Sequence, residues 1–450
     1  MISLGKFFGT DGIRGIAGVD LTADFAFKLG NVVGSYLLNK QKSKIITIGR
    51  DTRISSGMLE AAISAGICAA GMDINLLEVV PTPLVSFAIL REKLAGGIMI
   101  TASHNPFEYN GIKVFGSNGI KLEDWQEQEI EALFEKSVLQ NVSHVDVGVV
   151  RRDNLTKIKY VESLKGLISS LQIRPKIAID CANGSASATA NLIFGELGNL
   201  GDLKIINQNP DGININKHCG STDMRSLIEF VKKEGSDIGF AFDGDADRCL
   251  TVNSSGEVLD GDNILMILAR FMIQNKKLAG SKVVATKLSN MGFLKAMADL
   301  GIEVTTTDVG DKYVFEEMGR SGANLGGENS GHLICLDYSK AGDGQLTACL
   351  LLKAISELGL DFNELGSEFK KFPQVGKNIR VKDNKAIIEK KALKDEIERC
   401  KGALKDGGRV IVRASGTEPV IRIMVEGQDQ KQIEELAESL AKTVEELSPS

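Results

Sequence analysis

Short apolar runs that stop at polar residues recur along the chain, and they predict buried strands that lead into loops. Three of them share one pattern, in which a lysine precedes a β-branched apolar run and a small polar loop then opens a helix; they lie at residues 44–51, 176–183 and 282–289. Strand and helix signals that alternate in this way are typical of α/β domains with mixed or parallel sheets. Because the runs lie about one domain length apart, we expect three related α/β domains.

The pattern changes near residue 369. Strand signals at residues 377–381, 409–412 and 421–426 precede an amphipathic helix at residues 433–444, whose apolar positions are spaced three and four apart. This order predicts a smaller α+β domain at the C-terminal end. The domains that we expect from these signals are residues 1–150, 151–252, 253–368 and 369–450.

Threonines next to apolar-periodic runs predict where two helices begin. Thr22 precedes a run that continues to Leu38, and Thr222 precedes a run at residues 227–231. A threonine in this position can accept a hydrogen bond from a free backbone N–H of the first helical turn. We therefore expect both threonines to be N-caps.

A serine and a histidine lie where a predicted strand at residues 96–100 ends. The sequence TASHNP at residues 101–106 places Ser103 beside His104, just before a turn-forming Asn-Pro pair. Polar residues at strand ends are where α/β proteins tend to place chemistry. A turn without a chemical role explains this hexapeptide equally well, so its meaning depends on the other motifs.

A carboxylate cluster follows another predicted strand. Asp243, Asp245 and Asp247 alternate with small residues, so their oxygens can converge on one hard cation such as Mg²⁺. A calcium loop of the EF-hand type does not fit, because Arg248 and Ser254 stand where it needs glycine and glutamate. A phosphatase of the haloacid dehalogenase type would have no use for the third aspartate. A solvated acidic turn is the remaining alternative to a magnesium site.

Residues 326–332 form a glycine-rich loop with several hydrogen-bonding groups. The side chains are those of Glu328, Asn329, Ser330 and His332. A carboxylate, an amide, a hydroxyl and an imidazole on a loop that allows close approach suit a polyhydroxylated ligand such as a sugar. A tight turn with no ligand is the alternative.

The loop after the strand predicted at residues 409–412 has the composition of a phosphate site. A guanidinium fork, hydroxyl groups and free backbone N–H groups are what a phosphate dianion needs. They come from Arg413, Ser415, Gly416 and Thr417, with a second fork from Arg422. A surface turn that happens to contain arginine is the alternative.

With these four motifs, the chain resembles the phosphohexomutase superfamily along its whole length. The resemblance extends to FGTDGIRG at residues 8–15, NIN at residues 214–216, CGST at residues 219–222, SNMG at residues 289–292 and VGDKY at residues 309–313. These motifs are similar to those of the branch that acts on glucosamine phosphates. The resemblance implies four domains around a central cleft, each with one of the four site motifs.

The resemblance also implies a reaction. Ser103 would carry a phosphoryl group and give it to a glucosamine monophosphate, which forms glucosamine 1,6-bisphosphate as the intermediate and activator. That intermediate would turn over and return its other phosphate, so that glucosamine 6-phosphate and glucosamine 1-phosphate interconvert. One Mg²⁺ would be held by the side chains of Ser103, Asp243, Asp245 and Asp247.

Further roles follow from the same resemblance. Lys113 is placed as general acid/base, with His104 and His332 as the other candidates, and Lys113 would need a lowered pKa to serve as a base. Arg14 and Arg248 would neutralise phosphate oxygens. The sugar would contact Arg248, Glu328, Asn329, Ser330 and His332, and the unreacting phosphate would contact Arg413, Ser415, Gly416, Thr417 and Arg422. Asn329 replaces the glutamine usual in this branch, which shortens its reach by one methylene and could loosen substrate preference.

Two alternatives stay open. A phosphomannomutase or phosphoglucomutase would use the same chemistry on another sugar. A catalytically silent sugar-phosphate sensor would be expected to lose Ser103 or an aspartate first, and the chain retains all of them.

Composition narrows the class of protein. The chain has 450 residues, 43% of them hydrophobic and 25% charged, which is typical of a globular protein with more than one domain. A net charge of -6 argues against a nucleic-acid partner. We expect no signal peptide and no membrane span, because no apolar run is long enough. The seven cysteines form no C-x-x-C pair, so we expect reduced thiols in the cytoplasm. The resemblance implies a small sugar phosphate as ligand, and the sequence leaves open whether the protein is a monomer or a homodimer.

Overall fold

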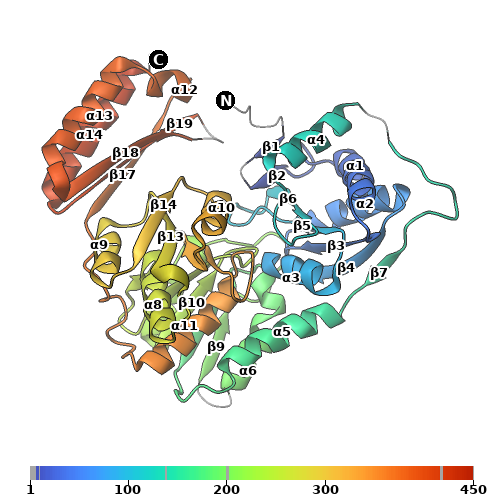
Figure 1. Cartoon of the computed structure of the whole chain (residues 1–450), viewed down its shortest axis with the longest axis horizontal. Coiled ribbons are helices and arrows are strands. Elements are labelled where there is room, and N and C mark those ends of the chain that lie inside the picture. Colours follow the sequence, from blue (N-terminus) through green and yellow to red (C-terminus); the bar gives the residue numbers. More distant parts are fainter. Residues whose placement is uncertain (1–6, 10, 137–138, 199–201, 416–418, 449–450) are drawn as a thin grey trace. The chain divides into compact units, whose positions relative to one another are not determined.

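The computed structural model divides the chain into two compact units (Figure 1). The first comprises residues 1–289 and 300–368, and the second comprises residues 290–299 and 369–450. The residues that the structure describes are 7–9, 11–136, 139–198, 202–415 and 419–448. Within these ranges, no helix has the length and apolar character that crossing a bilayer requires.

A mixed seven-stranded sheet begins the first unit. Its strands, from one edge to the other, are β1 (Phe8–Gly9), β2 (Gly12–Ile16), β6 (Tyr109–Gly116), β5 (Gly96–Ile100), β3 (Ile45–Arg50), β4 (Asp73–Val79) and β7 (Val150–Arg152). β3 is parallel to β4 and β5, whereas β6 is antiparallel to β5 and β2. The helices of this part are α1 (Ala23–Lys40), α2 (Ser56–Ala69), α3 (Thr82–Glu92) and α4 (Asp124–Glu135).

Two further mixed sheets complete the first unit. One contains, in spatial order, β12 (Val258–Leu259), β11 (Cys249–Asn253), β10 (Ile238–Phe242), β8 (Ile177–Asp180) and β9 (Leu203–Ile206). The other contains β14 (Glu303–Thr307), β13 (Lys282–Thr286), β15 (Leu325–Gly327) and β16 (Leu333–Cys335). Their helices are α5 (Leu155–Ile168), α6 (Ala190–Gly198), α7 (Arg225–Glu234), α8 (Gly261–Gln274), α10 (Asp311–Ser321) and α11 (Gly344–Leu358), with short 3-10 turns η1 (Ser185–Ala188), η2 (Gly220–Thr222) and η3 (Ala279–Ser281).

The three runs that share one sequence pattern become strands in three different sheets. β3, β8 and β13 each take an interior position. Interior strands are covered on both faces, which is why their sequences are continuous apolar runs rather than alternating ones. The predicted α/β class with mixed sheets is confirmed.

The second unit is a smaller α+β assembly. Its antiparallel sheet has the order β17 (Gln374–Arg380), β19 (Val420–Gly427) and β18 (Gly408–Ala414). Its helices are α9 (Met291–Asp299), α12 (Asn384–Ile388), α13 (Lys391–Leu404) and α14 (Gln430–Leu447), with the short turn η4 (Lys405–Gly407). α14 buries the stripe that the sequence predicts, at Ile433, Leu436, Ala437, Leu440 and Val444. The smaller α+β C-terminal domain is confirmed.

α9 belongs to the second unit although it lies between two strands of the third sheet in sequence. The Phe293 ring contacts Phe369, with ring centroids 6.0 Å apart. The backbone N–H of Met291 donates to the Glu426 carboxylate at 2.8 Å. These contacts explain why the compact unit takes in a helix from the middle of the chain. The division of the chain into four domains, at residues 1–150, 151–252, 253–368 and 369–450, remains a proposal.

One of the two predicted N-caps is confirmed. The Thr22 hydroxyl accepts a hydrogen bond from the Phe25 N–H at 3.2 Å at the start of α1. Thr222 lies instead in η2, and the N-cap of α7 is Met224, which has no capping side chain. The prediction for Thr222 is therefore wrong, because the chain makes a 3-10 turn before α7 begins.

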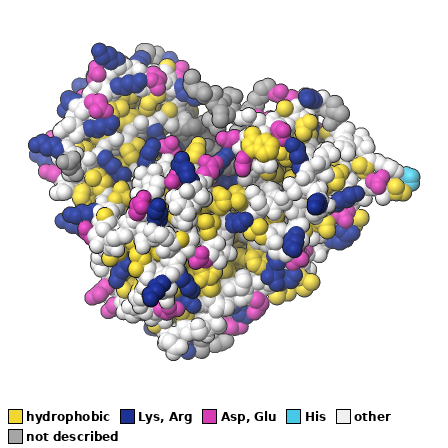
Figure 2. Space-filling view, viewed as in Figure 1, with side chains coloured by type: hydrophobic (Ala, Val, Ile, Leu, Met, Phe, Trp, Pro, Cys, Tyr) yellow, Lys and Arg dark blue, Asp and Glu magenta, His cyan; other side chains and the backbone are white. Residues whose placement is uncertain are grey.

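Charged side chains of both signs are interspersed over the visible face of the molecule (Figure 2). This mixture agrees with the small net charge of -6. Local charge therefore depends on which residues a site gathers, rather than on the balance of the whole chain.

Candidate active site

The serine loop follows β5 and leads into β6. Ser103 is almost fully buried and has a φ of +50°, the left-handed region that residues other than glycine rarely adopt. Its hydroxyl donates to the Asp243 carboxylate at 2.6 Å and lies 3.3 Å from the His104 Nδ1. The Ser103 N–H donates to the Thr101 hydroxyl at 2.9 Å. A strained residue held by several partners is typical of a functional position.

A buried arginine on the loop after β3 holds the serine loop in place. The Arg53 guanidinium donates to four backbone carbonyls, those of Ser103, Asn105, Pro106 and Tyr109. Its Nε donates to the Asp51 carboxylate at 2.8 Å, and both side chains are fully buried. Because the guanidinium fork is rigid and planar, it fixes the relative positions of these carbonyls.

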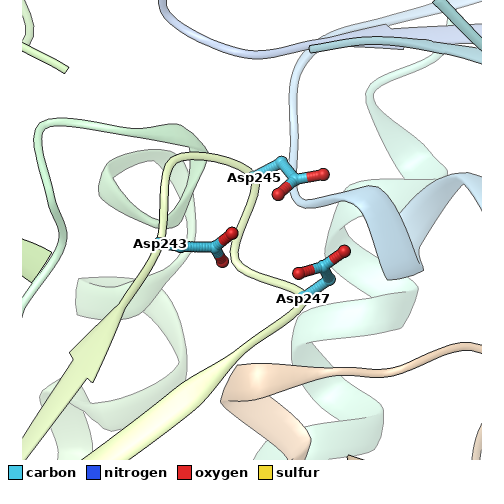
Figure 3. A group of neighbouring side chains, drawn as sticks. All are labelled: Asp243, Asp245 and Asp247. Atoms are coloured by element: carbon cyan, nitrogen blue, oxygen red, sulfur yellow. The ribbon is translucent and has the colours of Figure 1, made fainter. Parts of the chain in front are cut away.

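The three aspartates lie on the turn between β10 and β11 and their carboxylates face one another (Figure 3). Each offers an oxygen that lies within 4.8 Å of the oxygens of the other two, and all three residues are buried. The Oδ1 atoms of Asp245 and Asp247 accept no hydrogen bond from the described residues. Buried carboxylate oxygens without hydrogen bonds fit a hard divalent cation, so the donor set suits Mg²⁺.

Burial and mutual repulsion act strongly on Asp243. Burial, together with the negative charges of Asp247 and Asp245, raises the pKa of Asp243 well above its usual value, against the opposing effect of Arg248. The backbone N–H of Arg248 also donates to Asp243 at 3.2 Å. A cation bound among the carboxylates would relieve this repulsion.

Lys113 lies on β6 and contacts the aspartate cluster directly. Its ammonium is 3.0 Å from Asp245, 3.4 Å from Asp247 and 3.1 Å from Asp11, and the residue is only 1% exposed. Burial favours the neutral amine, but the carboxylates of Asp11, Asp245 and Asp247 outweigh it and raise the pKa of Lys113 well above its usual value. Lys113 would need a lowered pKa to serve as a base, and these surroundings raise it instead.

Histidines 104 and 332 have opposite electrostatic surroundings. Burial, with the nearby charges of Arg248 and Arg14, lowers the pKa of His104 to about 4, so its imidazole is neutral at pH 7. Burial also disfavours charge on His332, but Asp247 and Asp311 outweigh it and raise its pKa to about 9. His104 is therefore a neutral group beside Ser103, whereas His332 is a cation.

The glycine-rich loop connects β15 to β16. Glu328 is 7% exposed, and its carboxylate accepts hydrogen bonds from the Gly310 N–H at 2.9 Å and from the Ser330 hydroxyl at 3.3 Å. Asn329 and Ser330 are half-buried. The loop after β14 thus orients Glu328, and the neighbouring polar groups remain accessible to a ligand.

In the second unit, two arginines lie opposite each other on adjacent strands. Arg413 on β18 is the register partner of Arg422 on β19, and side chains at such positions lie on the same face and close together. The Ser415 N–H donates to the Val420 carbonyl at 2.8 Å, which fixes the end of β18. Two guanidinium groups on one face suit an anion. The predicted positions Gly416 and Thr417 lie outside the described residues.

Comparison with known proteins covers nearly the whole chain. The sequence matches four domains described as phosphoglucomutase/phosphomannomutase: alpha/beta/alpha domain I at residues 5–141, domain II at 158–256, domain III at 260–372 and the C-terminal domain at 377–443. The phosphoglucosamine mutase of Caldicellulosiruptor saccharolyticus is 44% identical over 449 residues, which is 98% of this chain and 99% of that one. That of Oceanobacillus iheyensis is 44% identical, again over 98% of this chain and 99% of its own. The chain belongs to the phosphoglucosamine mutase family.

Solved structures show that the phosphoglucosamine mutase fold of this chain is widely shared. A phosphoglucomutase/phosphomannomutase family protein from Burkholderia thailandensis superposes with a TM-score of 0.83 at 24% identity, over 100% of this chain and 99% of that one. An Aspergillus fumigatus N-acetylphosphoglucosamine mutase, in complex with GlcNAc-6P and magnesium, superposes with a TM-score of 0.66 at 16% identity, over 98% and 96%. At these identities the likeness concerns the fold.

The first unit gathers most of the residues singled out from the sequence. The Ser103 hydroxyl contacts both His104 and Asp243. The Lys113 ammonium contacts Asp245, and the His332 imidazole lies 3.6 Å from Asp247. Arg14 joins them through the Asn105 side chain, to which it donates at 3.2 Å.

Sequence reasoning missed three residues beside these groups, namely Asp11, Arg53 and Lys121. One signal was available for Arg53, which lies two residues after Asp51, the last residue of the first repeated strand pattern. Asp11 lies within the phosphoglucosamine mutase motif at residues 8–15 but carries no chemical signature of its own. Lys121 has no local signal, because its partners are distant in sequence.

Proposed function

We propose that this protein is a phosphoglucosamine mutase that interconverts glucosamine 6-phosphate and glucosamine 1-phosphate, an isomerase that moves a phosphoryl group within its substrate. The observation that carries the proposal is the Ser103 hydroxyl held 2.6 Å from Asp243 within a buried aspartate cluster. Full-length relatives of that name at 44% identity support it. The product would supply UDP-N-acetylglucosamine and cell-wall precursors.

The reaction we propose has two balanced phosphoryl transfers. A hydroxyl of the sugar monophosphate attacks the phosphorus of phospho-Ser103; the new O–P bond forms as the Ser103 O–P bond breaks, giving glucosamine 1,6-bisphosphate. In each of the two transfers, the proton of the attacking hydroxyl is passed, in net, to the oxygen that leaves. After this intermediate turns over, the Ser103 hydroxyl takes the phosphoryl group from the other end, and the sugar is released with its phosphate moved. Serine serves here as a carrier, so no nucleotide is consumed.

The metal site we propose uses Ser103, Asp243, Asp245 and Asp247. When bound there, one Mg²⁺ would neutralise charge on the transferring group. Lys113 and Arg14 would donate to phosphoryl oxygens. Asp243 is closer to the Ser103 hydroxyl, at 2.6 Å, but we place it on the metal. The neutral His104 imidazole lies 3.3 Å from the same hydroxyl, and we assign proton transfer at this oxygen to it.

We place the sugar against the loop between β15 and β16, with contacts to Arg248, Glu328, Asn329, Ser330 and His332. A carboxylate at Glu328 would favour an ammonium at the sugar 2-position over a hydroxyl, because a charge-assisted hydrogen bond is the stronger one. The unreacting phosphate would be bound by Arg413, Ser415, Gly416, Thr417 and Arg422. We propose that the enzyme acts in the cytoplasm, as a monomer or a homodimer.

The phosphoserine can be tested directly. Peptide mapping by mass spectrometry should locate a phosphoryl group on Ser103, and Ser103→Ala should lose nearly all turnover while it still binds sugar phosphate. Ser169→Ala, an exposed serine that ends α5, is the matched control and should retain activity. Full activity of Ser103→Ala would rule out the covalent mechanism.

The substrate needs a separate comparison. We expect kcat/KM to be higher for glucosamine 1-phosphate than for glucose 1-phosphate or mannose 1-phosphate, each assayed with the matching 1,6-bisphosphate. A preference for mannose or glucose would move the protein to the phosphomannomutase or phosphoglucomutase branch and leave the two-step transfer in place.

A further inference from the structure

A closed ring of alternating charges runs through the first unit and shares Asp247 with the aspartate cluster. We call it the charge ring, and its members in order are Lys113, Asp11, Lys121, Asp311, His332 and Asp247. Each cation lies between two carboxylates, and each carboxylate lies between two cations. The members come from the surroundings of all three sheets of this unit. The ring therefore joins elements that are far apart in sequence.

Lys121 closes one half of the ring. Its ammonium lies 2.7 Å from Asp11 and 2.6 Å from Asp311, which begins α10. Asp11 in turn contacts the Lys113 ammonium at 3.1 Å and Arg14 at 2.6 Å. Through one carboxylate, Lys121 is thus connected to two cations that the proposed reaction uses.

The other half of the ring passes through His332. Its imidazole lies 3.7 Å from Asp311 on one side and 3.6 Å from Asp247 on the other. Asp247 returns to Lys113 at 3.4 Å. The members are half-buried or buried, with Lys121 18% and Asp311 21% exposed in their side chains. Ion pairs shielded from water in this way depend strongly on each partner.

Lys121 is the cation that separates two carboxylates from different domains. Asp11 and Asp311 both lie within hydrogen-bond distance of its single ammonium, so their oxygens are within two hydrogen-bond lengths of each other. Without a cation between them, two carboxylates this close repel. Their movement apart would carry Lys113 and His332 away from the aspartate cluster.

We infer that Lys121 is a positioning residue for phosphoryl transfer, which acts through Asp11 and Asp311 to hold Lys113 and His332 in place. This inference rests on the proposed function. A displacement of about 1 Å at reacting groups can cost about a hundredfold in rate, so a residue that touches no substrate can still control turnover.

The test is the substitution Lys121→Met, which removes the charge and keeps the length of the side chain. We expect kcat to fall about tenfold to a hundredfold, while KM for glucosamine 1-phosphate changes less than about threefold. Lys121→Arg keeps the charge and should retain most of kcat. The larger guanidinium has room, because Lys121 borders a cavity of about 380 Å³.

Two further variants separate positioning from general stability. Lys312→Met breaks another ion pair, between α10 and Asp124 at the start of α4, that lies outside the ring. It is the matched control, and its kcat should stay within about twofold of the wild type. The double variant Lys121→Met/Asp311→Asn also removes the Asp311 carboxylate through which Lys121 acts on His332. Its kcat should therefore lie within about threefold of that of Lys121→Met, because the two residues act as one unit and their losses do not add.

Hydrogen exchange gives a readout that does not need turnover. Backbone amides of residues 328–335 should exchange faster in Lys121→Met than in the wild type, and should be unchanged in Lys312→Met. The inference is overturned if Lys121→Met keeps kcat and exchange at wild-type values, if Lys121→Arg is as impaired as Lys121→Met, or if the loss lies in melting temperature alone. A wild-type enzyme inactive on glucosamine phosphate would contradict the proposed function, and exchange would still decide the role of Lys121.

Discussion

At the scale of single residues, Lys113 keeps its charge in a place where burial alone would remove it. Three carboxylates lie within 3.4 Å of its ammonium, and their combined charge outweighs the loss of water. The carboxylates depend on Lys113 in turn, because its positive charge balances part of their negative charge. A single change in the cluster should therefore alter the binding of any further cation.

Asp245→Asn tests this dependence. The substitution keeps the shape of the side chain but removes one charge and one ligand oxygen, so we expect Mg²⁺ affinity to fall at least about tenfold. Isothermal titration with magnesium chloride measures it. The exposed Asp337→Asn is the control and should bind as the wild type does. Binding to wild type should also weaken when Ser103 is dephosphorylated, and equal affinity of wild type and Asp245→Asn would show that the site lies elsewhere.

At the scale of secondary-structure elements, the loop after β3 shapes the loop after β5. Arg53 donates its N–H groups to a carboxylate and to carbonyls of the serine loop, and Asn216, in the turn after β9, donates to the Ser103 carbonyl at 2.8 Å. The left-handed conformation of Ser103 is thus imposed by neighbouring elements. Loss of the hydrogen bonds from Arg53 to the serine loop should therefore lower the free energy of unfolding.

Arg53→Met would leave the Asp51 carboxylate buried without its cation and would remove one donor from each of four carbonyls. We expect the free energy of unfolding to fall by about 3–5 kcal/mol. The chain has a single tryptophan, Trp125 in the first turn of α4, so urea unfolding followed by its fluorescence reports on this domain. Arg50→Met, which breaks a partly exposed pair with Glu60, should cost no more than about 1 kcal/mol. Equal losses for both variants would contradict the role of Arg53.

The buried aspartate that caps α11 predicts that the stability of the protein depends on pH. Asp343 is the N-cap of α11, accepts a hydrogen bond from the Leu346 N–H at 2.9 Å and receives the Tyr160 hydroxyl from α5. Burial raises its pKa to about 6. Since this value lies above that of an unfolded aspartate, about 3.9, folding favours the protonated carboxyl. Its contribution to stability is complete below about pH 4 and is lost as pH rises through 6.

Asp343→Asn keeps an N-cap oxygen but cannot ionise. We expect the variant to gain stability relative to the wild type between pH 4 and pH 7, by up to about 3 kcal/mol from the pKa difference. Melting temperatures of both proteins across this pH range measure the gain. Parallel curves for the two proteins would contradict the assignment.

At the scale of the whole molecule, the sequence predicts the architecture better than it predicts electrostatics. The strands that precede Ser103 and Asp243 are found as expected, because apolar runs and turn residues are local signals. The N-cap at Thr222 fails because the turn before α7 is not encoded by the cap residue alone. The partners of Lys121 and the direction of the Lys113 pKa shift depend on residues brought together only by folding, and no local pattern carries them.

Removal of the residues after 368 should expose the apolar face of α9. Phe293 and Met297 are fully buried in the second unit, whose other residues begin at 369. A protein that ends at residue 368 should expose these side chains, melt at a lower temperature and bind a hydrophobic dye such as ANS. Phe293→Ser/Met297→Ser in the truncated protein should reduce the dye binding. A truncated protein with unchanged melting and no dye signal would contradict the assignment of α9 to the second unit.

The same helix has a consequence for synthesis on the ribosome. α9 leaves the exit tunnel well before residues 369–450, with which it packs, because residues 300–368 are made in between. At the usual pace of translation, its apolar face waits several seconds without its partners. During this interval the nascent chain offers a chaperone a short, exposed, hydrophobic segment, and the C-terminal unit cannot finish folding until the last part of the chain returns to a helix made earlier.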